Sequence, residues 1–313
     1  PPQWARRTTA RTPIRISGPP AGSSALQTAL DPSGRSVLGT FNNCAHGYTP
    51  WGTFLACEEN FANYFINAKS PEHRRYGVTV KGRGYRWNDF DERFDLAKHP
   101  NEVNRFGWIV EIAPYEPTST PVKRTALGRF AHEGAQLSLT ADGRIVFYSG
   151  DDATFEYIYK FVSRDRFDPR NRSANRDLLD HGTLYVARFM EDGSGQWLPL
   201  MHGTGPLTRE NGFADQADVL VRARNAADAL GASPMDRPEW IAVHPQSREV
   251  FCTLTNNTRR GAKDVAAPGR ANPRENNTFG HIIRWREAAD DPAATAFRWD
   301  VQGDVAFEQR DGR

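Results

Sequence analysis

The sequence of 313 residues lacks a long apolar run, and its longest ones, such as Trp240–Val243, are only a few residues long. A helix that crosses a bilayer needs about 20 consecutive apolar residues, so we expect no membrane span. Charge of one sign is also lacking, because 40 Lys and Arg face 38 Asp and Glu. Such a balance gives no global attraction to nucleic acid or to an anionic membrane, and we expect neither as a partner.

Cysteine is scarce, and the three residues Cys44, Cys57 and Cys252 cannot all pair internally. The odd count argues against a disulfide scaffold and leaves at least one thiol for packing or for a metal. A structural zinc site is not expected, because the sequence has no Cys-x-x-Cys. The fingerprints Gly-x-Gly-x-x-Gly, the P-loop, Gly-x-Ser-x-Gly and His-Glu-x-x-His are absent too. These absences disfavour dinucleotide enzymes, P-loop NTPases, standard α/β-hydrolases and zincins.

Short β-like runs alternate with turn signals along most of the chain, and 26 Gly and 21 Pro residues separate them. Runs rich in β-branched and aromatic residues predict strands. They are residues 108–112, 144–148, 157–162, 183–189, 240–243, 249–254 and 281–285. Helical periodicity is scarce, and Gln216–Leu230 is its best candidate. Lys263–Asn277 has no apolar periodicity and reads as a long loop of the kind that often carries function.

A strand, a short turn and a second strand recur at Gln136–Phe147 and at Trp240–Leu254. Hairpins that recur around longer loops favour a propeller or another closed β architecture. Residues 1–35 are rich in Pro, Arg, Ser and Thr, which predicts an extended N-terminal arm. We therefore expect an all-β fold, a β-propeller with long irregular loops and few helices, over residues 36–313.

Functional side chains are densest in Asn42–Asn60. This segment combines two thiols, a histidine, amides and two adjacent acids around a Thr-Pro-Trp-Gly turn. A thiolate beside carboxylates suits a transition metal better than magnesium or calcium alone. A structural alternative stays open, in which Cys57 is buried and Glu58 and Glu59 are solvated.

Three further motifs place charged side chains beside expected strands. Glu133 precedes one strand, where it can ligate a metal or act as a base. Asp151 and Asp152 follow another strand and suit a hard cation. In the third motif, Arg237 offers a forked donor set for a phosphate or carboxylate, and Glu239 offers a metal ligand. Ordinary solvated turns would show the same patterns.

The loop Asn272–His281 combines amides, Arg274 and a histidine, and Thr255–Arg260 matches it upstream. Asparagine side chains can ligate or orient a neutral group, but they also cap turns.

Read together, these motifs resemble the PhoX family of bacterial alkaline phosphatases. The resemblance rests on six motifs in one order, which span about residues 39–287. They are Asn42–Asn60 with its Thr-Pro-Trp-Gly-Thr and Cys-Glu-Glu-Asn, His132–Gly134, Gly150–Asp152 with Tyr157–Val162, Arg237–Glu239, Leu254–Asn257, and Asn272–Arg274 with Gly280–Ile282.

The resemblance implies a β-propeller whose axial site holds iron and calcium ions and hydrolyses phosphate monoesters. By motif position, it implies Cys57 as the iron-binding thiolate. It implies Glu133 and Glu239 as carboxylate ligands of the metal cluster. It implies that Arg237 binds the phosphate of the substrate and stabilises the charge that builds on the transferring group.

The remaining transfers from the resemblance concern loops. Asp151 and Asp152 are expected as further metal ligands, and Asn43 and Arg274 as substrate-binding residues. Family members continue beyond the point where this sequence stops, so the propeller domain is expected to be truncated at its C-terminal end. The resemblance also implies export through a twin-arginine leader to the periplasm or the exterior, and we expect a monomer.

A different class of protein fits the same pattern. A non-catalytic β-propeller would use the same loops to bind a ligand or a partner. Metal content separates the two readings, because iron with calcium supports the enzyme and no metal supports the scaffold.

Overall fold

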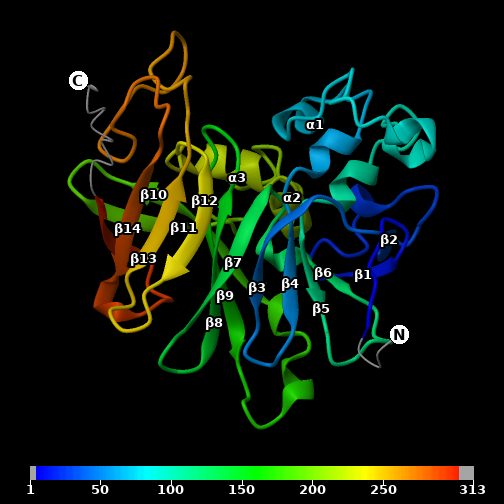
Figure 1. Ribbon diagram of the computed structural model, residues 1–313, viewed down its shortest axis with the longest axis horizontal. Helices are drawn as coiled ribbons and strands as arrows, with labels where there is room; N and C mark the ends of the chain where they lie inside the picture. Colours follow the sequence, from blue (N-terminus) through cyan, green and yellow to red (C-terminus); the bar gives the residue numbers. More distant parts are fainter. Residues whose placement is uncertain (1–4, 303–313) are drawn as a thin grey trace, which may run out of the picture.

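The computed structural model describes residues 5–302, which form mainly β-sheet with a few short helices (Figure 1). Hydrogen bonds join the strands into a six-stranded sheet and a nine-stranded sheet. The expected all-β fold with few helices is confirmed. The expected strands are confirmed as well, because each predicted run lies in or overlaps an observed strand.

Three antiparallel meanders of four strands, which we call blades, make up most of the two sheets. Blade 1 contains β3 (Asn43–Tyr48), β4 (Phe54–Glu58), β5 (Ile109–Ile112) and β6 (Val122–Arg124). Blade 2 contains β7 (His132–Leu139), β8 (Arg144–Asp151), β9 (Ile158–Arg166) and β10 (Gly182–Phe189). Blade 3 contains β12 (Pro238–Val243), β13 (Val250–Leu254), β14 (His281–Glu287) and β15 (Ala296–Val301).

Additional strands extend these blades at their outer edges. β11 (Ser194–Pro199) pairs with β10 and with β15, so blades 2 and 3 form one continuous nine-stranded sheet. β1 (Pro13–Ser17) runs parallel to β6 and pairs with β2 (Ser36–Leu38), which extends blade 1 to six strands. Residues 13–17, inside the segment expected to be an extended arm, thus belong to a sheet. The boundary of the arm at residue 35 stays a prediction.

The helix predicted over residues 216–230 is confirmed as two consecutive helices, α2 (Gln216–Val221) and α3 (Ala223–Leu230). The break lies at Arg222, whose φ of −108° and ψ of 39° depart from helical values. The only other α-helix in the described part of the chain is α1 (Pro71–Arg75). Within residues 5–302, no helix has both the length and the apolar character that a bilayer crossing requires.

The first strands of the three blades, β3, β7 and β12, lie beside one another in the middle of the molecule (Figure 1). Two glycines permit this close approach. A Cβ atom at Gly47 on β3 would lie 2.2 Å from the carbonyl oxygen of Ala135 on β7. A Cβ atom at Gly150 on β8 would lie 2.6 Å from the carbonyl oxygen of Glu239 on β12. Both contacts are with backbone, so the blades themselves would have to move apart.

We therefore expect Gly47→Ala and Gly150→Ala to destabilise the fold, each by about 1–3 kcal/mol, the usual cost of overpacking. Chemical denaturation followed by circular dichroism measures the change. Gly269→Ala is a matched control, because its Cβ would meet only the end of the Glu191 side chain, which can turn away. Equal stability of the Gly47, Gly150 and Gly269 variants would contradict the close packing of the blades.

Candidate metal centre

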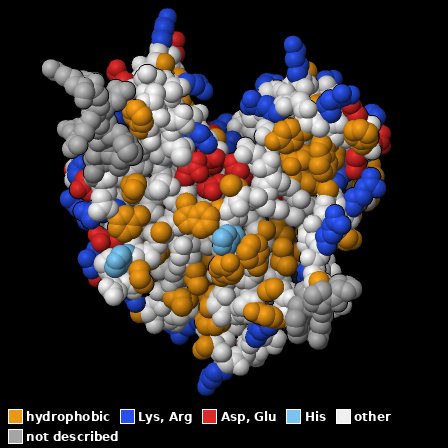
Figure 2. All heavy atoms as spheres, viewed as in Figure 1, with side chains coloured by type: hydrophobic (Ala, Val, Ile, Leu, Met, Phe, Trp, Pro, Cys, Tyr) orange, Lys and Arg blue, Asp and Glu red, His pale blue; other side chains and the backbone are white. Residues whose placement is uncertain are grey.

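Acidic side chains gather where one end of the three blades meets. Figure 2 shows them in a hollow between two lobes of the surface. The inner strands β3, β7 and β12 begin there, and β4 and β8 end there. These strand ends contribute Cys44, Glu59, Glu133, Asp152 and Glu239. The residues come from all three blades, so the cluster exists only when the blades are assembled.

The donor atoms of this cluster fall into two groups that share Glu133. Sγ of Cys44 and one carboxylate oxygen each of Glu59 and Glu133 lie within 4.8 Å of one another. One oxygen each of Glu133, Asp152 and Glu239 meets the same limit. Sγ of Cys44 is 3.6 Å from Oε1 of Glu133. Oε2 of Glu133 is buried and has no hydrogen-bond partner among the described residues, so its lone pairs are free to bind a cation.

The site residues occupy equivalent positions in the three blades. The first and second strands of the blades pair at Asn43↔Glu58, His132↔Asp151 and Pro238↔Leu254. The residues that follow are Cys44 and Glu59, Glu133 and Asp152, and Glu239 and Thr255. Just beyond these pairs, each inner strand has a register shift. Such irregularities re-aim side chains and are frequent beside functional sites.

The carboxylates of the cluster hold protons more tightly than carboxylates in water. Burial, with help from Glu239, raises the pKa of Glu133 to about 7. Burial and the neighbouring Asp152 raise the pKa of Glu59 and of Glu239. Burial and Glu133 raise the pKa of the Cys44 thiol to about 12. A bound cation would reverse these shifts, because metal ligands must be deprotonated.

Arg237 is the guanidinium beside this acidic cluster. Its Nε and Nη2 donate to the two carboxylate oxygens of Asp152 at 3.0 and 3.1 Å. Nη2 also lies 3.3 Å from Oε1 of Glu239, and Nη1 donates to Oδ1 of Asn256 at 3.2 Å. The side chain keeps 33% of its surface exposed, so it also faces the open hollow.

The backbone of Arg237 has a φ of +48°, which is uncommon for a residue other than glycine. The carbonyl of Arg237 accepts a hydrogen bond from the N–H of Thr255 at 3.1 Å. The preceding Asp236 is fully buried and accepts from Asn257 at 2.9 Å and from Arg260 at 2.8 Å. These contacts hold the unusual conformation that directs Arg237 to the cluster. Strain of this kind often accompanies function.

Four residues singled out in the sequence meet in this site: Glu133, Asp152, Arg237 and Glu239. Asp151 does not join them. Successive residues of a strand point to opposite faces, so Asp151 points into the interior when Asp152 points to the hollow. The Asp151 carboxylate is fully buried, and its Oδ2 accepts from Nε of Arg224 at 2.8 Å.

Cys57 is not among the clustered donor atoms either. It is fully buried in the hydrophobic core of blades 1 and 2, where it packs with residues such as Leu55 and Ile109. Burial raises the pKa of its thiol above the ordinary value, and Glu133 adds to this effect. Cys57 therefore lies near the site but has the environment of a packing residue, and the thiol in the cluster belongs to Cys44.

The other two residues expected to bind the substrate are Asn43 and Arg274. Asn43 begins β3 next to Cys44, is exposed, and accepts a hydrogen bond from the Thr40 hydroxyl at 2.8 Å. Nη1 of Arg274 donates to the carbonyl of Gly280 at 2.7 Å, within its own loop. Their roles in substrate binding stay predictions.

Sequence reasoning did not single out Cys44 and Glu59, whose donor atoms belong to the cluster. The sequence also allowed Glu59 to be a solvated surface residue, yet only 5% of its surface is exposed. Aligning the three strand pairs would have found both residues, because they occupy in blade 1 the positions that Glu133 and Asp152 occupy in blade 2.

Comparisons with known proteins point to one family. The model of a family described as alkaline phosphatase PhoX matches residues 2–309. Among solved structures, the chain is similar to Pseudomonas fluorescens PhoX in complex with vanadate, a transition state analogue. The sequence identity is 55% and the TM-score is 0.93. The match covers 96% of this chain and 54% of that chain, so this chain spans about half the length of its relative. No curated protein matches the sequence.

The electrostatics of the cluster predict how a cation bound there would stabilise the protein at different pH, and added calcium is the probe. Glutamate in an unfolded chain has a pKa of about 4.3, so the folded metal-free protein binds more protons than the unfolded chain. The resulting stability is fully present below about pH 4 and is lost as the pH rises through the folded pKa of Glu133, about 7. Because calcium displaces these protons, we expect it to raise the melting temperature more at about pH 8 than at about pH 6.

Scanning calorimetry of chelator-treated protein, with and without added calcium, measures this difference. The variant Glu133→Gln should show a smaller calcium effect at every pH and a weaker dependence on pH. A calcium effect that is the same at both pH values would contradict the shifted pKa of Glu133.

Proposed function

This chain belongs to the PhoX alkaline phosphatase family, and from that membership we propose that it carries a metal-dependent site that hydrolyses phosphate monoesters. The observation that carries the proposal is the shared cluster of four carboxylates and one thiol beside the exposed fork of Arg237. Such a cluster concentrates negative charge, which cations would neutralise. The arginine provides a complementary contact for the phosphate.

The donors present in the chain fit the metals that the resemblance implies. We propose that Cys44, Glu59 and Glu133 hold iron, because a thiolate with carboxylates suits a transition metal. We propose that Glu133, Asp152 and Glu239 hold calcium, which prefers oxygen ligands. The unpartnered Oε2 of Glu133 and the raised pKa of its carboxyl support both assignments. Bound cations would supply Lewis acidity, which neutralises phosphate oxygens and activates water.

The chain's own residues orient the substrate around these ligands. The planar guanidinium of Arg237 is held by two bonds to Asp152 and one to Asn256, so its orientation is set before a ligand arrives. A preoriented fork of N–H donors matches phosphate oxygens in pairs and gains energy as negative charge builds on the transferring group. The contact between Thr255 Oγ1 and Glu239, 3.2 Å long, fixes the carboxylate on the other side of the arginine.

Other expectations from the family remain proposals. We propose that the substrates are small phosphate esters. We further propose that the protein acts in the periplasm or outside the cell and that it is a monomer. These proposals rest on family membership and on the site, and direct measurement of secretion and of mass in solution would test the last two.

The thiol assignment predicts different outcomes for two cysteine variants. Cys44→Ala should lower the iron content of the purified protein at least about tenfold, because it removes a metal ligand. Cys57→Ala should keep its iron and lose some thermal stability, because its thiol is a packing group. Elemental analysis and the absorption of iron–thiolate bonds measure the first effect, and calorimetry measures the second. Iron lost in a folded Cys57→Ala variant but kept in Cys44→Ala would return the ligand role to Cys57.

The proposed role of Arg237 predicts how its variants hydrolyse p-nitrophenyl phosphate. We expect Arg237→Gln to lower kcat/KM about a hundredfold or more, the usual effect of removing a charged donor from a transition state. Arg237→Lys should recover little of this loss, because lysine lacks the planar fork. Metal content should stay the same in both variants. Unchanged kcat/KM in Arg237→Gln would contradict a role of Arg237 in phosphate binding.

A further inference from the structure

A second polar cavity lies at the opposite end of blade 1 from the acidic cluster. It has a volume of about 600 Å³. Thr53, which lines it, immediately precedes β4, whereas Glu59 of the cluster immediately follows that strand. At about 3.3 Å per residue, β4 separates the two by a distance on the order of 15 Å. The cavity is thus distinct from the candidate metal centre, and its size suits a small molecule.

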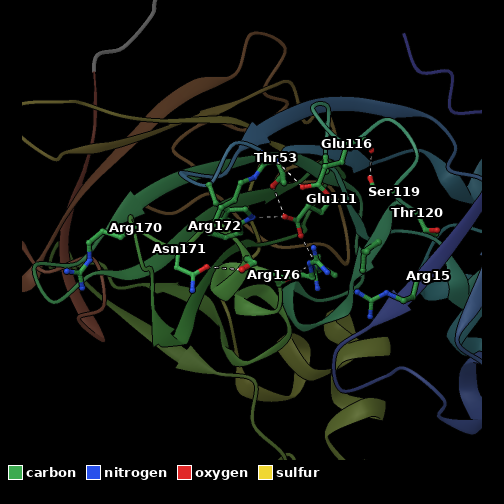
Figure 3. Close-up of a pocket in the computed structure, with 15 residues that line it drawn as sticks. Arg15, Thr53, Glu111, Glu116, Ser119, Thr120, Arg170, Asn171, Arg172 and Arg176 are labelled. Atoms are coloured by element: carbon green, nitrogen blue, oxygen red, sulfur yellow. Dashed lines mark hydrogen bonds and ion pairs between the residues drawn. The ribbon is translucent and has the colours of Figure 1, made fainter. Parts of the chain in front are cut away.

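Arginine dominates the lining of this cavity. Five arginines face two glutamates there: Arg15, Arg124, Arg170, Arg172 and Arg176 against Glu111 and Glu116. Figure 3 shows Arg15, from β1, on one side and Arg172 and Arg176 on another. Arg170 lies apart, with its guanidinium turned away. The remaining polar lining consists of hydroxyl and amide groups, from Thr53, Ser119, Thr120, Asn171 and Ser173.

The carboxylate on the floor of the cavity already has a cationic partner. Glu111 is buried, and its Oε2 lies 2.6 Å from Nε of Arg124. Its Oε1 accepts from the Trp51 indole at 2.8 Å and from the Thr53 hydroxyl at 2.6 Å. The charge of Arg124 is in turn balanced by Glu111 and by Asp180, 2.9 Å away. One guanidinium thus faces two carboxylates, so the floor carries about one net negative charge, which the arginines around the rim outweigh.

The cations around the rim are not neutralised to the same degree. Within residues 5–302, the side chains of Arg15 and Arg176 have neither a hydrogen bond nor an ion pair. Arg172 has two long contacts, 3.8 Å to the exposed Glu116 and 6.0 Å to the ring centre of Tyr115. Cations that converge on one concave surface repel each other, and the walls of a cavity strengthen the field inside it. An anion placed among them would remove this repulsion.

We propose that this cavity binds a small anion with two or more phosphate or carboxylate groups. Arg15, Arg172 and Arg176 supply the charge and the forked donors, which match both kinds of group. Thr120 supplies a neutral hydroxyl beside them. More than one anionic group is required, because the unpaired arginines come from β1 and from the connection between β9 and β10, on different sides of the space.

Isothermal titration with two probes tests the proposal on the protein as purified. Methylenediphosphonate represents phosphate groups and is not hydrolysed, and tricarballylate represents carboxylates. We expect at least one probe to bind, and the Arg15→Gln/Arg176→Gln double variant to bind it at least about tenfold more weakly, because charged hydrogen bonds are lost. The probe that binds identifies the chemistry of the ligand.

Two controls separate this cavity from the metal centre and from surface charge. Arg166→Gln removes an exposed arginine outside the cavity and should bind the probe like the unaltered protein. Arg237→Gln removes the proposed phosphate contact beside the metal centre and should leave the cavity signal intact. The double variant should fold normally, because its altered side chains have no partner to lose, and its melting temperature checks this. Absence of binding by both probes at about 10 mM, or equal binding by the double variant, would overturn the proposal. Loss of the signal in Arg237→Gln alone would assign the binding to the metal centre and overturn it as well.

Discussion

Buried ion pairs, one residue behind the acidic hollow, are the interactions on which the rest of the site depends. The residue that precedes each of Glu59, Asp152 and Arg237 is a fully buried acid. A buried carboxylate needs a cation, and each has one: Glu58–Lys123 at 2.7 Å, Asp151–Arg224 and Asp236–Arg260 at 2.8 Å. Removing one partner of such a pair costs about 3–5 kcal/mol, because the other charge stays buried. The pairs thereby fix the strand ends that carry the site.

Much of the fold could be predicted from the sequence, because it is encoded in local patterns. The strand at 144–148 follows an Ala-Asp-Gly turn, and the helical period over 216–230 continues through the break at Arg222. The motifs also marked Glu133, Asp152, Arg237 and Glu239, all of which meet in the structure. What these residues share is a position near a strand end, within two residues of a glycine or a proline, and that is visible in a single sequence.

The face of a strand to which an individual side chain points could not be predicted in the same way. Cys44 and Cys57 lie in one motif, and only the pairing of β3 with β4, shifted between Asn43 and His46, decides which thiol reaches the cluster. The same holds for Asp151 and Asp152, which are chemically alike and separated by a single step along the strand. Composition favoured both members of each pair equally. The register of a strand is a long-range property, and a shift of one residue exchanges the two faces.

The threefold repetition of the blades explains how one fold can offer two kinds of metal position. Equivalent backbone positions place Cys44, Glu133 and Glu239 on the inner strands, while the second strands contribute Glu59, Asp152 and Thr255. The backbone geometry is therefore repeated, but the donor atoms differ. The donor group next to blade 1 includes the sulfur of Cys44, whereas the group between blades 2 and 3 consists of carboxylate oxygens. Glu133 belongs to both groups, so its two oxygens can serve neighbouring cations. In the proposed site, softness of the donors would place iron beside the thiol and calcium beside the carboxylates.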